Sequence, residues 1–280
     1  MTTTAFRRGP RAVAPGVDAS PVELQAPPEI PGTSGTSALM TLLPLLGGVG
    51  SMAFFVVGGS GAASWIGGGA MFASMLAMGA ANVGRAGTRR RAQMADDRRD
   101  YLRYLGQVRA RVGATADAQR AALEQLHPAP DALAGLVRGP RLWERRPRDG
   151  DFGVVRIGTG PQRLAAPLQP PETGPAEDLE PVAAAALRRF VATHQTVVDL
   201  PVAVALRSFR TVSVTGPREG RDALARALLA QLATWHSPDE LRIAVLADPS
   251  RAPTWDWVKW LPHAQHPRLR DAAEIGRAHV

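Results

Sequence analysis

Hydrophobic and polar positions divide this chain into one long uncharged stretch and a remainder in which charged residues are frequent. From Ile30 to Gly84 no side chain is ionisable. The hydrocarbon core of a bilayer takes about 20 apolar residues of helix per crossing, so this run is long enough for two crossings. Its pattern predicts transmembrane helices at residues 39–57 and 62–83, joined by a glycine-rich turn.

Arginines on both sides of the uncharged run set its expected orientation. They are Arg7, Arg8 and Arg11 before the run and Arg85, Arg89, Arg90, Arg91, Arg98 and Arg99 after it. Because basic flanks stay on the cytoplasmic side, we expect a multi-pass protein of the cell membrane with both termini in the cytoplasm. Much of the net charge of +8 lies just after the run, where anionic lipid headgroups are the expected partners. No nucleic acid is expected.

The segments next to the uncharged run have contrasting patterns. Residues 1–38 are rich in proline, glycine and threonine, which predicts a mostly disordered arm with an extended stretch at 23–31. Residues 85–127 contain no proline and predict a basic helical stalk that Gly113 could break into a hairpin. Apolar residues at helical spacing give this stalk one hydrophobic stripe, formed by Tyr101, Leu105, Val108 and Val112.

Residues 140–274 have the pattern of a globular α/β domain. Strands are expected at 154–157, 202–206, 211–214 and 241–246, and helices at 179–194 and 220–235. A strand, a glycine-containing turn, a helix and a further strand form a βαβ unit, which favours a parallel sheet. We therefore predict a membrane-proximal, degenerate NTPase-like α/β domain that is truncated at its C-terminal end.

The turn at residues 211–222 lies where a nucleotide-binding loop would be expected. A phosphate-binding loop has four residues between its glycines, followed by lysine and a hydroxyl residue. Here three residues separate Gly216 from Gly220, and Arg221 and Asp222 follow. We interpret the segment as a tight strand-to-helix turn and predict no catalytic, cofactor-binding or metal residue.

Other chemically suggestive residues are weaker candidates. His263 and His266 have a metal-like spacing but lie in a proline-flanked loop without an evident third ligand. Asp248 could ligate Mg²⁺ only beside a competent phosphate loop. Three tryptophans, Trp255, Trp257 and Trp260, lie close together in sequence. They could stack on single-stranded nucleic acid, or they could pack at the edge of a core or at a protein contact. The chain has no cysteine, which excludes disulfides and thiolate metal sites.

Four segments resemble, in order and spacing, segments of the EccC family, the membrane ATPases of type VII (ESX) secretion systems. They read QAPPEIP at residues 25–31, LWERRPRDGDF at 142–152, QLATWHSPDEL at 231–241 and WDWVKWLPH at 255–263. Members of that family carry two spans, a stalk, a membrane-proximal ATPase-like domain and FtsK/SpoIIIE-type ATPase domains in series. These motors drive export of small helical WXG-type proteins.

The resemblance implies that this chain is the membrane-anchoring N-terminal part of such an ATPase. Its implied partners are other type VII secretion membrane subunits, further copies of itself and, through the missing C-terminal domains, the secreted substrates. ATP and Mg²⁺ are expected as cofactors of the full-length protein. Because the chain stops at Val280 before any Walker A sequence, we expect this fragment to be inactive alone.

Two other classes of protein remain open from the sequence. One is the anchor of an FtsK-like DNA translocase, and the other is a membrane scaffold without enzymatic activity. Walker sequences downstream would separate a motor from a scaffold, and co-purification with DNA would separate the two motors. Residues 275–280 match the translation of a sequencing adapter, so we expect an adapter-derived tail and a natural protein that continues after residue 274.

Overall fold

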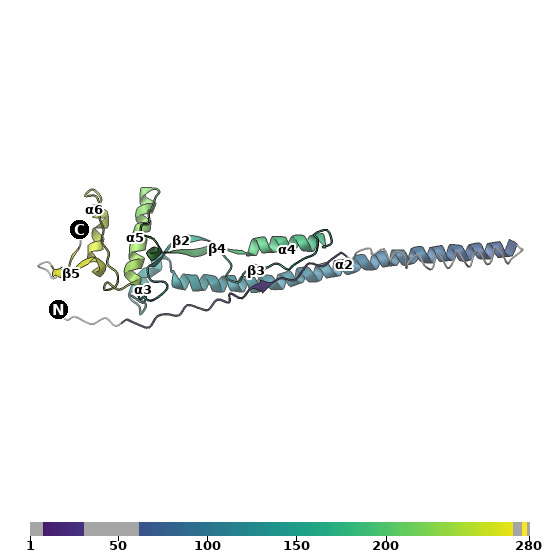
Figure 1. Ribbon diagram of the computed structural model, residues 1–280, viewed down its shortest axis with the longest axis horizontal. Helices are drawn as coiled ribbons and strands as arrows, with labels where there is room; N and C mark the ends of the chain where they lie inside the picture. The colour runs from purple at the N-terminus through teal and green to yellow at the C-terminus, as the bar shows by residue number, and fades with distance from the viewer. Residues whose placement is uncertain (1–7, 31–61, 271–275, 279–280) are drawn as a thin grey trace. The chain divides into compact units, whose positions relative to one another are not determined.

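The computed structural model describes residues 8–30, 62–270 and 276–278, and its mixture of helices and strands confirms the α/β class in outline (Figure 1). The chain forms two compact units. The first unit combines Met1–Ala19, Ala114–Ala165 and Thr196–Val280, and the second combines Ser20–Gly113 and Ala166–Gln195. Helix α2 (Ala62–Leu126) contributes residues to both units.

Helix α2 is the element in which the predicted stalk lies. It continues through Gly113 without a break, so the predicted option of a helical hairpin is wrong. It ends at Leu126, and Pro128, which follows, lacks the amide that a further helical turn needs. The predicted hydrophobic stripe is confirmed, because all its members are buried, namely Tyr101, Leu105, Val108 and Val112.

The two predicted membrane spans have different outcomes. The first, at residues 39–57, lies outside the described residues, and the second, at 62–83, forms the beginning of α2. Within the described parts of the chain, every helix falls short of the combined length and apolar character that a bilayer crossing requires. In residues 62–83, glycine, serine and asparagine interrupt the apolar side chains and dilute their hydropathy. The predicted pair of transmembrane helices is therefore not supported, nor is a multi-pass protein.

In the second unit, residues 20–30 are extended and ordered by contacts, where we expected a mostly disordered arm. Strand β1 (Val22–Glu23) pairs in parallel with β3 (Leu168–Gln169) and lies along α2 (Figure 1). The Tyr101 hydroxyl donates a hydrogen bond to the Gln25 carbonyl at 2.9 Å. These contacts bury two apolar side chains of the segment, Val22 and Leu24. The expected extended stretch at 23–31 is confirmed as far as residue 30.

Helix α4 (Pro181–His194) confirms the helix expected at residues 179–194 and also belongs to the second unit. Glu180 is its N-cap, and the Glu180 carboxylate accepts a hydrogen bond from the Ala183 N–H at 2.6 Å. Proline at the first helical position fits because the amide there has no intrahelical partner. The Ile30 N–H donates to the Asp178 carbonyl at 2.6 Å just before this helix. The extended segment is thereby fixed at the start of α4.

The sheet of the first unit differs from the predicted one. Strand β2 (Val154–Arg163) pairs antiparallel with β4 (Thr196–Ala205), and the two lie side by side (Figure 1). The strands expected at 211–214 and 241–246 do not form, so the predicted parallel βαβ unit is wrong for the described residues. Leu246 remains 93% exposed. A strand there would gain little burial to offset its ordering.

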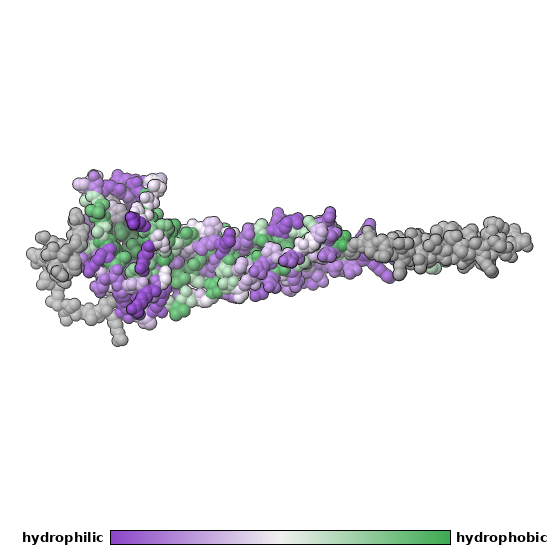
Figure 2. All heavy atoms as spheres, viewed as in Figure 1, coloured by the Kyte–Doolittle hydropathy of each residue, from purple (hydrophilic) through white to green (hydrophobic). Residues whose placement is uncertain are grey.

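The rest of the first unit is mostly helical. Helix α5 (Arg218–Trp235) confirms the helix expected at 220–235. The shorter elements are η1 (Pro130–Ala132), α3 (Leu133–Val137), η2 (Leu206–Ser208), α6 (Ala252–Trp255), η3 (Asp256–Trp260) and η4 (Pro262–Ala264), followed by the antiparallel pair β5 (Gln265–Arg270) and β6 (Gly276–Ala278). Hydrophobic side chains also reach the surface of this unit (Figure 2). Ile157 on β2 and Val198 on β4 are exposed.

Candidate functional site

Three of the four segments that carry the family resemblance meet inside the first unit. The Trp143 N–H donates to the Thr234 carbonyl at 2.8 Å, and the Arg145 N–H donates to the Trp235 carbonyl at 3.0 Å. Trp143 has a φ of 57°, which is rare for a bulky side chain. Its indole N–H bonds the Ala233 carbonyl at 3.0 Å, so both donors of Trp143 hold it against the end of α5.

Arg145 lies at the centre of this arrangement and is only 1% exposed. Its guanidinium donates to the carbonyls of Leu126 at 2.6 Å and Val154 at 2.5 Å. It also stacks 4.6 Å from the Trp235 ring and lies 3.3 Å from the Asp151 carboxylate. Burial lowers the pKa of Arg145 to about 10, so the side chain stays charged at neutral pH. Arg145 therefore joins the end of α2, the start of β2 and the end of α5.

Two buried histidines complete the cluster. His236 Nε2 accepts from the Gly153 N–H at 2.9 Å, so its Nδ1 carries the proton and donates to the Leu232 carbonyl at 2.9 Å. His263 Nε2 lies 2.8 Å from the His236 carbonyl and donates to it. Burial is the main cause that lowers the pKa of both side chains, which are therefore neutral at pH 7. Both imidazoles act as structural hydrogen-bonding groups.

The N-terminal residues of the first unit lie against the acidic edge of this cluster. Arg11 forms ion pairs with Asp149 at 3.0 Å and Asp151 at 2.6 Å. Arg8 pairs with Glu240 at 3.0 Å. This part of the expected disordered arm is thus held by charge pairs to the same segments that surround Arg145.

The segment at residues 211–222 forms a turn that leads into α5, with no strand at 211–214. Gly216 has a φ of 132°, a conformation that favours glycine, and α5 begins two residues later. Asp222 accepts a hydrogen bond from the Arg251 guanidinium, which is the main cause of its lowered pKa. Arg221 and Arg218 lie 3.8 and 3.9 Å from the same carboxylate. A carboxylate placed where a phosphate-binding loop has its hydroxyl repels phosphate, and it is satisfied by arginines instead.

We predict that the purified chain releases phosphate from ATP only at the background rate. Arg221→Gln and Asp222→Asn should leave that rate unchanged, because these residues form an ion-pair cluster and not a phosphate cradle. A coupled phosphate-release assay with excess Mg²⁺ measures this. Turnover well above background that both substitutions abolish is the contrary result.

The remaining sequence candidates are not brought together into a site. The side chain of His266 is outside the described part of the structure, and Asp248 accepts two hydrogen bonds from Ser250. Among the described residues, no three His, Cys, Asp or Glu side chains cluster closely enough to hold a metal ion. Trp255 and Trp257 pack against the buried residues Ile243, Val258 and Ala264, while Trp260 is 63% exposed. Packing at a core edge therefore describes two of the three tryptophans.

No protein-family model matches the chain, but several proteins of ESX secretion systems are similar to it in sequence. An ESX secretion system protein EccC of Thermomonospora curvata is 46% identical over 275 residues, which is 98% of this chain and 21% of that protein. The ESX-4 secretion system protein EccC4 of Mycobacterium tuberculosis H37Rv is 46% identical over 187 residues, 66% of this chain and 15% of the relative. EccC3 of ESX-3 from that strain is 36% identical over 275 residues, 97% of the chain and 21% of the relative.

These similarities identify the chain as part of a component of ESX, or type VII, secretion systems. Within that class, the chain belongs to the EccC family. It spans about a fifth of the length of the Thermomonospora relative. The resemblance inferred from the four sequence segments is confirmed, and three of them have a packing role in the first unit.

Proposed function

We propose that this chain is the N-terminal structural part of a type VII secretion ATPase and takes part in export of small helical WXG-type proteins. The observation that carries the proposal is 46% identity to an ESX secretion system protein over 98% of the chain. ATP binding with Mg²⁺ and hydrolysis then belong to the longer protein. The buried Arg145 supports a scaffolding task, since its guanidinium bonds carbonyls of two elements and stacks on the Trp235 ring of a third.

A competition experiment tests this proposal in a bacterium that produces the full-length protein. Expression of residues 1–280 in excess should reduce export of WXG-type substrates, because the segment occupies positions meant for the intact ATPase. Crosslinked, tagged segment should capture other ESX membrane subunits. The matched control is the Arg145→Ala variant at equal abundance, which should compete poorly because its first unit is destabilised. Unchanged export with no ESX subunit captured, or capture of DNA instead, is the outcome against it.

We also propose that the uncharged segment at residues 30–84 attaches this protein to the cell membrane. Support comes from the sequence, since a charge-free run with arginine at both ends is typical of membrane-associated segments. The full chain should stay in the membrane pellet after alkaline carbonate extraction. A variant lacking residues 39–83 should be released into the supernatant. Equal partitioning of the two proteins would contradict membrane attachment by this segment.

A further inference from the structure

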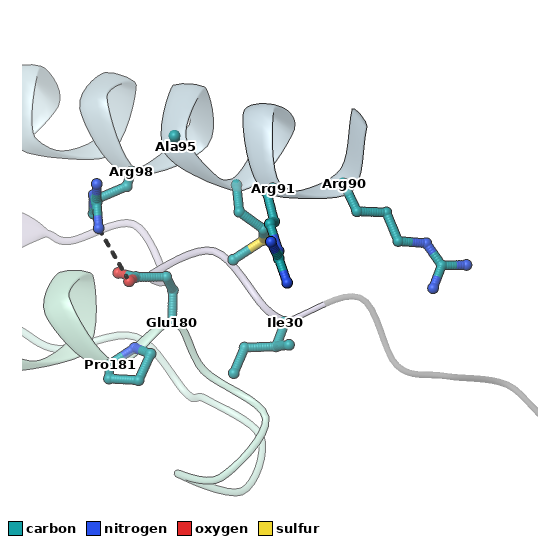
Figure 3. Close-up of a pocket in the computed structure, with 8 residues that line it drawn as sticks. Ile30, Arg90, Arg91, Ala95, Arg98, Glu180 and Pro181 are labelled. Atoms are coloured by element: carbon teal, nitrogen blue, oxygen red, sulfur yellow. Dashed lines mark ion pairs between the residues drawn. The ribbon is translucent and has the colours of Figure 1, made fainter. Parts of the chain in front are cut away.

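The first residue of the uncharged run, Ile30, lines one groove of the second unit together with the part of α2 that begins six residues after the run ends. The arginines that follow the run lie on α2 across from Ile30 (Figure 3). The groove has a volume of about 400 Å³. It is lined by Ile30, Arg90, Arg91, Met94, Ala95, Arg98, Glu180 and Pro181.

Cationic and apolar groups are combined in the groove. Arg91 and Arg98 are seven positions apart on α2, which places them on one side of the helix about 10 Å apart along its axis. Met94 lies between them in sequence, and Figure 3 shows the Arg91 side chain extending from α2 toward Ile30. Guanidinium groups bind phosphate oxygens, and the neighbouring aliphatic side chains suit glycerol and the first methylenes of an acyl chain.

The one carboxylate among the lining residues, that of Glu180, balances one of the three lining arginines through its ion pair with Arg98 (Figure 3). Glu180 accepts a hydrogen bond from the Ala183 N–H at 2.6 Å as the N-cap of α4. Its other oxygen lies 4.0 Å from Arg98, a distance longer than a hydrogen bond. Because a guanidinium has five N–H donors, Arg98 can face Glu180 and still donate to an anion. Lining arginines outnumber the carboxylate, so the groove favours a negatively charged ligand.

We propose that this groove binds the headgroup phosphate of an anionic phospholipid, with Arg91 and Arg98 as its donors. The inference rests on the proposed membrane attachment, which would place both ends of the uncharged run at the bilayer surface. Bound lipid would then tie α2, the extended segment that ends at Ile30 and the start of α4 to one another. The result would be a fixed geometry for the second unit at the membrane surface.

The test is a lipid titration of the full chain in non-ionic detergent, read as the shift of its thermal unfolding midpoint. Dioleoyl-phosphatidylglycerol should raise the midpoint, and phosphatidylcholine at the same concentration should raise it much less. The Arg91→Gln/Arg98→Gln variant should need about tenfold more phosphatidylglycerol for half of the shift, as expected for lost charge-assisted hydrogen bonds. The matched control, Arg89→Gln/Arg99→Gln, removes equal charge from neighbouring positions of α2 outside the groove and should behave as wild type.

Three results would overturn the inference. They are an unchanged titration of the groove variant, an equal loss in the control variant, and a full shift produced by inorganic phosphate in place of lipid. Arg91→Gln alone keeps the contact of Arg98 with Glu180 and should show a partial loss of the lipid response. The unfolding midpoint of each variant without lipid reports whether the variant is folded. Carbonate extraction reports membrane attachment separately, so failure of the groove and failure of attachment give different results.

Discussion

Replacing Arg145 by alanine is expected to destabilise the first unit by about 3–5 kcal/mol, because two buried carbonyl oxygens are left without their charged donor. These are the carbonyls of Leu126 and Val154. Asp151 keeps its ion pair with Arg11. The Trp235 ring would also lose the guanidinium that lies 4.6 Å from it. This one side chain contacts three segments of the unit, so its removal should lower the free energy of unfolding more than removal of a surface arginine.

Urea unfolding of the full chain in non-ionic detergent, followed by tryptophan fluorescence, measures this effect. All tryptophans except Trp65 lie in the first unit, so the emission reports mainly on that unit. Arg146→Ala is the matched control, since this neighbouring side chain is exposed and its loss should cost less than about 0.5 kcal/mol. Arg145→Lys should fall in between, because lysine keeps the charge but not the planar fork. Equal stability of the Arg145 and Arg146 alanine variants would show that the buried guanidinium is not structural.

The helices of this chain could be predicted from sequence because their signals are local. In α2, the stripe from Tyr101 to Val112 repeats at helical spacing, and a proline follows the end of the helix. Helix α4 begins with a proline after a capping glutamate. Such features act within one or two turns, so no knowledge of the tertiary fold is needed.

The sheet could not be predicted because strand pairing is a long-range choice. The runs at 211–214 and 241–246 alternate like strands, but alternation does not say which partner is present. The observed pairing instead joins β2 to β4, so that Val155 lies opposite Val204. The helix α4 lies between these strands in sequence, which hides their antiparallel relation.

The cluster around Arg145 could not be predicted either, because its contacts join residues that are far apart in sequence. In the sequence, Arg145 stands out only as a member of the segment LWERRPRDGDF, and its burial is unexpected because charged residues are ordinarily exposed. Its burial depends on Leu126, Val154 and Trp235, which come from three separate elements. The partner of Asp222, Arg251, likewise lies outside the turn at residues 211–222, so local spacing could not reveal it. Sequence spacing thus argues against a phosphate cradle at this turn, but it could not find the packing site around Arg145.

Acidification from pH 7 to pH 5 is expected to destabilise the first unit through its buried histidines. Burial, and then the charge of Arg145, lower the pKa of His127 to about 4, compared with 6.5 for an exposed side chain. His236 and His263 also have lowered pKa values, mainly through burial. Between pH 6.5 and the folded pKa, the unfolded state binds more protons than the folded state, so stability falls as pH falls. For partly buried His127 alone, the loss at pH 5 should be about 1–2 kcal/mol.

Urea titrations of the full chain at pH 7, 6 and 5 measure this slope, again by tryptophan fluorescence. Glutamine does not titrate, so protonation at position 127 cannot destabilise the His127→Gln variant. Its free energy of unfolding should therefore fall less steeply than that of wild type between pH 7 and 5. His194→Gln is the comparison variant, because His194 lies in the second unit, which contains only one of the tryptophans. It should retain the wild-type slope in this readout. A slope that His127→Gln leaves unaltered would mean that His127 titrates in the folded protein as it does in water, and that the polar groups around Arg145 are more accessible to solvent than their burial implies.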